Sequence, residues 1–169
     1  DNIPTYTEFI LGLPGDTYDV FADGVSMVIE AGQHNRIQYN NLSILPNAEM
    51  AKPEYIEEYK ILTSKNPIVN AHGTLDETPA DGIYETQELV ISTKSLPRDK
   101  WIDTRVYASM SEFLYFNKLL QIPLLLIHKI CNVSFRNLFE TFIFEIDKYP
   151  VLKSIKDNFR THAKEIING

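Results

Sequence analysis

The order of apolar and turn-forming segments in the first 45 residues constrains the fold more than any other feature. An apolar run from Thr5 to Leu13 ends at Pro14-Gly15, and a second apolar run covers Arg36 to Leu45. Proline presets the first central position of a type II turn, and glycine takes the positive φ of the second. Five apolar residues between the runs share one face of an expected helix: Val20, Phe21, Val25, Val28 and Ile29. This spacing predicts a right-handed, parallel βαβ unit.

The expected helix has a signal at each end. Asp16 or Thr17 can cap its amino end, because a short polar side chain accepts a hydrogen bond from the first turn. Gly32 is well placed to end it after Ala31. In a unit of this kind, ligands bind at the loops that follow the carboxyl ends of the strands.

The rest of the chain divides near Lys100. Residues 1–100 carry a net charge of −9 and seven of the nine prolines, whereas residues 101–169 carry +2. Before the boundary we expect a short helix from Pro53 to Leu62, an irregular stretch over 63–82 and a strand from Tyr84 to Thr93. Beyond it we expect helices over Trp101 to Leu120, from near Pro123, over Phe135 to Tyr149 and from Val151.

Composition excludes several classes of protein. The net charge of −7 argues against a nonspecific nucleic-acid binder, and a single cysteine, Cys131, excludes an internal disulfide. The most apolar stretch, Leu119 to Ile130, is too short and too broken by Gln121 and Pro123 to span a membrane. The free thiol and the lack of an export signal at the start of the sequence lead us to expect a cytoplasmic protein.

Three stretches resemble one enzyme family. Residues 7–17 (TEFILGLPGDT) resemble the fifth-strand motif of radical S-adenosylmethionine enzymes, in the subgroup with a cobalamin-binding domain. Residues 37–46 (IQYNNLSILP) resemble the sixth strand of that subgroup, and residues 89–101 (LVISTKSLPRDKW) are a weaker match. Two positions depart from the usual motif: Asp16 replaces glutamate, and Asn47 replaces a glycine. Asparagine tolerates the left-handed conformation better than most residues, so the second turn can survive.

The resemblance implies an α/β fold: the βαβ end of a partial (β/α) barrel, followed by a helical C-terminal region. Residues 1–50 would be the last two strands and a helix of the barrel, 51–100 a connector with a short helix, a loop and a strand, and 101–169 a helical tail. The family's Cys-x3-Cys-x2-Cys motif is absent, and a [4Fe–4S] cluster needs several thiolates. We therefore expect the C-terminal fragment of an iron–sulfur oxidoreductase, an oxidative cyclase or a methyltransferase, inactive alone.

The same resemblance implies a set of site residues. The backbone of Leu11, Gly12 and Leu13, and that of Leu45 and Pro46, would line the adenosine site of S-adenosylmethionine. The alternative is that Gly12, Pro14 and Gly15 only form a tight turn. Tyr39 and Asn41 lie at the end of a barrel strand and are candidates for substrate contacts, as is Asn40. In the full-length protein the cofactors would be S-adenosylmethionine, a [4Fe–4S] cluster and, in the cobalamin-using members, cobalamin; this chain alone would bind none.

Other chemically active residues favour plain structural roles. Asp76, Glu77, Asp81 and Glu85 are expected in a solvated loop rather than at a cation site, and the four histidines are scattered. Cys131 is expected to be a packed small residue rather than a nucleophile. We predict no catalytic residue and no metal ligand in this chain.

The tail from residue 113 to 144 is rich in aromatic residues and leucine. It could form a lid on the barrel, a contact between two copies of the chain, or a plain helical core. The expected partners are the remainder of the same polypeptide and an unknown small-molecule substrate. The rival interpretation is a non-enzymatic α/β-helical module that binds a partner, or itself, through these apolar helices.

Overall fold

The computed structural model describes residues 5–68 and 85–169. It begins with strand β1 (Thr7–Leu11), helix α1 (Tyr18–Glu30) and strand β2 (Ile37–Asn41), and the two strands pair in parallel, with Thr7 opposite Ile37. The Asp16 N–H donates to the Leu13 carbonyl at 3.1 Å across a turn in which Gly15 has a φ of 94°. The Thr17 hydroxyl accepts from the Val20 N–H at 3.2 Å and so caps α1. The predicted βαβ unit is confirmed.

A second, antiparallel sheet follows. It contains β3 (Ser43–Ile44), β4 (Leu62–Pro67) and β5 (Thr86–Ser92) in the order β3-β5-β4. The predicted strand from Arg36 to Leu45 is therefore divided at Leu42. The Leu42 N–H donates to Leu11 at 2.9 Å, and the Leu42 carbonyl accepts from Val90 at 2.8 Å, so this residue joins the two sheets.

The connector between β3 and β5 differs from the prediction. It holds a short 3₁₀ turn (Glu49–Ala51) and helix α2 (Pro53–Tyr59), which ends before Leu62 because Lys60 takes a left-handed conformation with a φ of 48°. The expectation of an irregular stretch over 63–82 was wrong for 63–67, which belong to β4. Of the remaining residues of that stretch, only position 68 is among the described residues. The turns predicted over 69–82, with the acidic residues Asp76, Glu77 and Asp81, lie outside them.

The tail is helical, as expected, but its elements have other bounds. They are α3 (Arg98–Ser111), a π-helical turn (Glu112–Phe116), α4 (Gln121–Cys131), α5 (Phe135–Phe144) and α6 (Pro150–Asn168). The expected single helix from Trp101 to Leu120 stops because the π-helical turn leads into Lys118, whose φ is 65°. Asn132 ends α4 in the left-handed region, and the Ser134 hydroxyl caps α5 through the Asn137 N–H at 3.2 Å.

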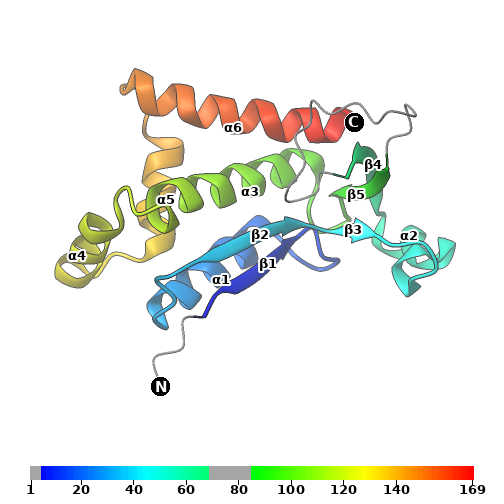
Figure 1. The fold of residues 1–169 in the computed structure, drawn as a ribbon, viewed down its shortest axis with the longest axis horizontal. Coiled ribbons are helices and arrows are strands. Elements are labelled where there is room, and N and C mark those ends of the chain that lie inside the picture. Colours follow the sequence, from blue (N-terminus) through cyan, green and yellow to red (C-terminus); the bar gives the residue numbers. More distant parts are fainter. Residues whose placement is uncertain (1–4, 69–84) are drawn as a thin grey trace.

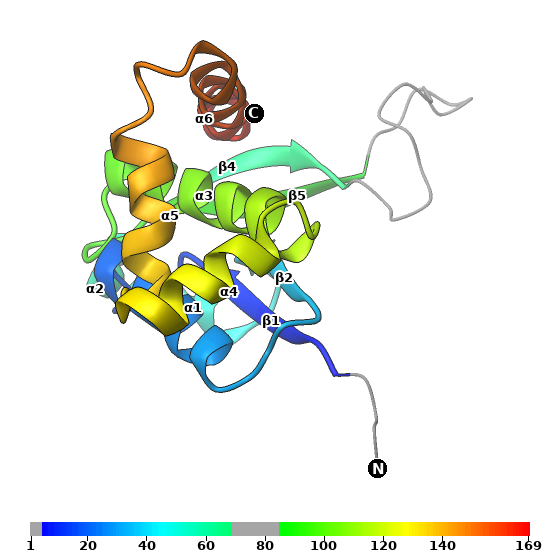
Figure 2. The same cartoon turned by 90° about the vertical axis from the view of Figure 1, so that its left-hand side faces the viewer.

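The main core lies around α3. Figure 1 shows α3 in the middle of the molecule, with α6 on one side and the strands β1 and β2 on the other. The Phe9 ring on β1 contacts Phe21 on α1, and the Tyr39 hydroxyl on β2 contacts Ser111 on α3, so both helices pack on one face of these two strands. Figure 2 gives the same elements from another side. Trp101, Tyr107, Met110 and Leu114 are fully buried in this core. Among the described residues, no helix combines the length and the apolar character that crossing a bilayer requires.

Candidate functional site

The carboxyl end of β1 carries the first three residues of the predicted adenosine site. Leu11 is fully buried in the main core, and Leu13 packs against a smaller cluster that contains Leu42, Ile61 and Val90. Both side chains are therefore occupied by packing, which leaves the backbone as the part that could face a ligand.

Gly12 has a backbone conformation that few other residues tolerate. Its φ is 101°, and a Cβ added to it would lie 3.5 Å from Val90 Cγ1 and 3.7 Å from Trp101 Nε1. These are ordinary contact distances, so the positive φ, rather than lack of space, requires a glycine. The tight turn of the alternative interpretation is thus present. A tight turn and a ligand contact are compatible, because the ligand would contact the backbone of Gly12.

Leu45 and Pro46 follow β3, a few residues beyond the bond that joins Leu42 to Leu11. The Leu45 side chain is 65% exposed. Asn47 has a φ of 67°, and the Ala48 N–H donates to the Leu45 carbonyl at 3.2 Å. The turn therefore survives the replacement of glycine, as predicted. The adenosine role of these five residues stays a prediction.

Tyr39 points into the core. Its hydroxyl lies 2.8 Å from Ser111 Oγ, and its ring packs against Phe9 and Phe21, with centroids 6.3 and 6.0 Å away. Burial raises the pKa of this hydroxyl well above its usual value, so it stays neutral. The side chain is enclosed between the strands and α3.

Asn41 lies on the same face of β2 as Tyr39, because strand residues alternate between faces. Within the described residues its Oδ1 is buried and has no hydrogen-bond partner, and the same holds for Trp101 Nε1. The substrate role predicted for Tyr39 and Asn41 remains untested by these contacts, which put Tyr39 in a structural position.

The opposite face of β1 and β2 is largely polar, and its side chains are exposed or half-buried. Glu8 and Ile10 are exposed there, and Gln38 and Asn40 are half-buried. The Asn40 Nδ2 donates to Glu8 Oε2 at 3.4 Å, and Gln38 Nε2 donates to Asn40 Oδ1 at 3.3 Å. We call Glu8, Asn40 and Gln38 the polar ladder. The sequence analysis did not select Glu8 or Gln38 as site residues. The available signal was the alternation of polar residues with Ile37 and Tyr39 along β2.

The chain does not fit an iron–sulfur cluster. Its one cysteine, Cys131, is exposed at the end of α4, so the expectation of a packed residue was wrong. In residues 5–68 and 85–169, no three His, Cys, Asp or Glu side chains gather in a way that could hold a metal ion. The nearby His128 instead stacks on Phe135 with ring centroids 4.6 Å apart, and its Nδ1 lies 2.9 Å from the Val133 carbonyl.

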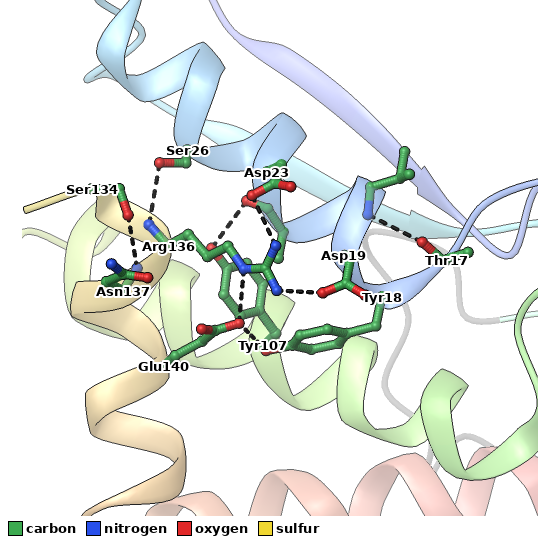
Figure 3. A network of polar contacts seen from close by, with 12 residues as sticks. Thr17, Tyr18, Asp19, Asp23, Ser26, Tyr107, Ser134, Arg136, Asn137 and Glu140 are labelled. Atoms are coloured by element: carbon green, nitrogen blue, oxygen red, sulfur yellow. Dashed lines mark hydrogen bonds and ion pairs between the residues drawn. The ribbon is translucent and has the colours of Figure 1, made fainter.

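Arg136 is the centre of a polar network between α1 and α5, shown in Figure 3. Its guanidinium donates to Asp23 Oδ1 and Glu140 Oε1, both at 2.9 Å, and pairs with Asp19. The Tyr18 hydroxyl donates to the same Glu140 oxygen at 3.1 Å. These bonds, first that to Asp23, raise the pKa of the guanidinium. Because every guanidinium nitrogen has a partner, the network serves to join two helices rather than to bind a ligand.

Comparison with known proteins adds a family context. No family model matches the chain. Over 116 residues the chain is 40% identical to the cobalamin-dependent radical SAM methyltransferase TokK of Streptomyces tokunonensis. It is 38% identical, over the same length, to the 2-(S-pantetheinyl)-carbapenam-3-carboxylate methyltransferase of Streptantibioticus cattleyicolor. The matches cover 68% of this chain and 16% of each relative, so the chain spans a small part of the curated relatives' length.

Proposed function

Because the chain belongs by sequence to the cobalamin-type radical S-adenosylmethionine enzymes, we propose that it is a C-terminal portion of a methyltransferase of that family. The observation that carries the proposal is the 38–40% identity to two such methyltransferases, together with the parallel β1-α1-β2 unit that such a barrel requires. Both relatives are named as methyltransferases. Of the three reactions that the sequence left open, methyl transfer has this support, and oxidation and ring closure have none.

The cofactors of such an enzyme are S-adenosylmethionine, an iron–sulfur cluster and cobalamin, and they supply the radical and the methyl group. The cluster finds no ligand set in this chain, so we propose that its ligands lie elsewhere in the complete protein and that this chain alone is inactive. The chain's own residues would position the adenosine part of S-adenosylmethionine. The left-handed backbone at Gly12 would bring a main-chain segment close to the adenosine, and the bond from Leu42 to Leu11 would hold the ends of β1 and β2 together.

The test compares two proteins. The complete gene product that contains this chain is made without oxygen and supplied with iron and cobalamin, and the 169-residue chain is made alone. We expect the complete protein to release 5′-deoxyadenosine and to methylate the compound named in the second relative, 2-(S-pantetheinyl)-carbapenam-3-carboxylate, which serves as the assay compound. Mass spectrometry measures both products. The proposal is wrong if the chain alone cleaves S-adenosylmethionine, or if the complete protein does not.

One observation favours the rival function of an interaction module. The apolar residues of α4 and the turn before it are largely exposed: Leu119, Ile122, Leu126, Ile127 and Ile130. An exposed apolar face of this kind is typical of a surface that contacts another protein segment. We propose that it contacts either the rest of the polypeptide or a second copy of the chain. Light scattering distinguishes the two, because only the second predicts a dimer of the isolated chain.

A further inference from the structure

We propose that the polar ladder on the uncovered face of β1 and β2 is a wall of the substrate cavity, where Gln38 and Asn40 hydrogen-bond the substrate. The inference rests on the proposed function and deepens it, because it names contact residues and a class of substrate. That class is a small molecule with amide or hydroxyl groups.

The first argument is the polarity of this face. Parallel strands are normally buried on both faces and carry apolar residues on each. The face of β1 and β2 toward the helices follows this rule, since Leu11 and Ile37 are fully buried. The other face carries a carboxylate and two amides. In the packed interior of a barrel, bulky aliphatic residues would be expected there, and unsatisfied polar groups would be costly. A cavity that holds a polar ligand accounts for the difference.

The second argument is the position of the ladder along the strands. Asn40 pairs with Ile10, immediately before Leu11 and Gly12, whose backbone we assign to the adenosine site. Gln38 pairs with Glu8 two residues earlier along the strands, about 7 Å further from their carboxyl ends. A substrate on the ladder would therefore lie beside the nucleoside, with Asn40 closer to the reacting atoms and Gln38 further away.

The third argument is the hydrogen-bonding capacity that remains. Each amide uses one N–H within the ladder, Asn40 toward Glu8 and Gln38 toward Asn40. Within residues 5–68 and 85–169, a second N–H on each amide, the Gln38 Oε1 and one Glu8 oxygen have no hydrogen-bond partner. The ladder fixes these groups in place and offers both donors and acceptors. Amides and hydroxyls match that combination. Glu8 would repel the carboxylate of the assay compound, so its pantetheinyl arm, which carries amide and hydroxyl groups, is the part that we expect on the ladder.

The experiment uses three variants of the complete protein and the assay compound. Gln38→Met and Asn40→Leu remove the polar groups and keep the approximate shape. Gln87→Met is the matched control, since Gln87 is a half-buried glutamine on β5 in the other sheet. Release of 5′-deoxyadenosine without the compound reports on the S-adenosylmethionine site, and the KM and kcat for methylation report on the ladder.

We expect Gln38→Met to raise the KM for the compound by about tenfold with little change in kcat. Asn40→Leu should raise the ratio of 5′-deoxyadenosine to methylated product by at least about fivefold, because the substrate is misplaced beside the radical. The control Gln87→Met should change none of these quantities by more than about twofold. Should Asn40→Leu fail to fold, Asn40→Asp, which keeps the shape, must show the same rise in that ratio.

Three results would overturn the inference, and they are distinguishable. If KM and the product ratio match those of the control, the ladder is only a solvated face. If the complete protein cleaves S-adenosylmethionine but does not methylate the compound, the substrate class is wrong. If it does not cleave S-adenosylmethionine at all, the proposed function itself fails.

Discussion

Gly12 and Gly32 share one backbone conformation but lie at opposite ends of the parallel strands. Their φ angles are 101° and 106°, Gly12 following β1 and Gly32 preceding β2. An alanine at either position is strained and should cost about 1 kcal/mol or more of stability. Only Gly12 belongs to the predicted adenosine site. We expect Gly12→Ala to lower 5′-deoxyadenosine release by the complete protein by about tenfold, and Gly32→Ala by no more than about twofold.

Steady-state release of 5′-deoxyadenosine, measured after each variant's folding is checked by circular dichroism, decides the point. Equal losses in the two variants would show that backbone strain alone accounts for the effect. The adenosine role of Gly12 would then be wrong, and the tight-turn interpretation would be correct.

His34 should make the stability of the chain depend on pH. Partial burial, and then the charges of Lys118 and Lys129, hold its pKa below the usual 6.5, and its Nδ1 lies 2.7 Å from the Tyr115 hydroxyl. The unfolded chain therefore binds a proton more readily than the folded chain. The stability contributed by neutral His34 is complete above about pH 6.5 and is lost as the pH falls below it.

Urea unfolding at about pH 7.5 and about pH 5.5 measures this effect. We expect the midpoint to fall on acidification, and His34→Gln to reduce the fall. His162→Gln is the control, because His162 is exposed on α6. An identical pH dependence in the His34 variant and the unmodified chain would contradict the assignment.

Arg136 links two elements through charge. It contacts Asp19 and Asp23 on α1 and Glu140 on α5, and only 22% of its side chain is exposed. Charge-assisted hydrogen bonds contribute more than exposed ion pairs, although the exposure of Asp19 and Asp23 reduces the gain. We expect Arg136→Met to lower the free energy of unfolding by about 1–2 kcal/mol.

The matched control is Lys153→Met, because Lys153 forms one exposed pair with Asp157 within α6. Its loss should be clearly smaller than that of Arg136→Met, because an exposed ion pair contributes little to stability. Urea denaturation of both variants provides the comparison. If the two variants are equally stable, the network in Figure 3 does not help to join the helices.

The elements that sequence reasoning predicted well are those with local signals. The Pro14-Gly15 turn, the Thr17 cap and the apolar faces sufficed for β1, α1 and β2. Strand β4 had no such signal, because its buried residues, Ser64 and Asn66, are polar. Asn66 Nδ2 donates to the Ile166 carbonyl at 3.0 Å, so the strand depends on a contact with α6 a hundred residues away.

The candidate site was predictable only in part, for a related reason. The glycine turns could be identified from residue type. Which face of β2 is covered depends on where α1 and α3 pack, and this five-residue strand has polar residues on both faces, Asn41 on one and Gln38 and Asn40 on the other. The substrate role of Tyr39 stays a prediction, and the structure adds that its hydroxyl lies in hydrogen-bond contact with Ser111 in the core.

The exposed face of α4 concerns the molecule as a whole. Ile122 is 71% exposed and Ile130 is 79% exposed, while Leu124 alone is fully buried among the described residues of this helix. We expect the isolated chain to self-associate and the double variant Ile122→Asp/Ile130→Asp to remain monomeric, because charges on this face oppose burial. Light scattering at increasing concentration measures the mass. If the unmodified chain is monomeric, self-association is excluded, and the rest of the polypeptide is the segment expected to contact α4.

The central position of α3 has a consequence for how the molecule opens. Helices α1, α5 and α6 and strands β1 and β5 all contact α3, whereas the main contacts of α4 with other helices are those to α5 and the π-helical turn. Amide protons exchange with solvent through local openings, and the segments with most buried neighbours open last. The backbone amides of α3 should therefore exchange most slowly and those of α4 early. Deuterium uptake would then appear in α4 before it appears in α3.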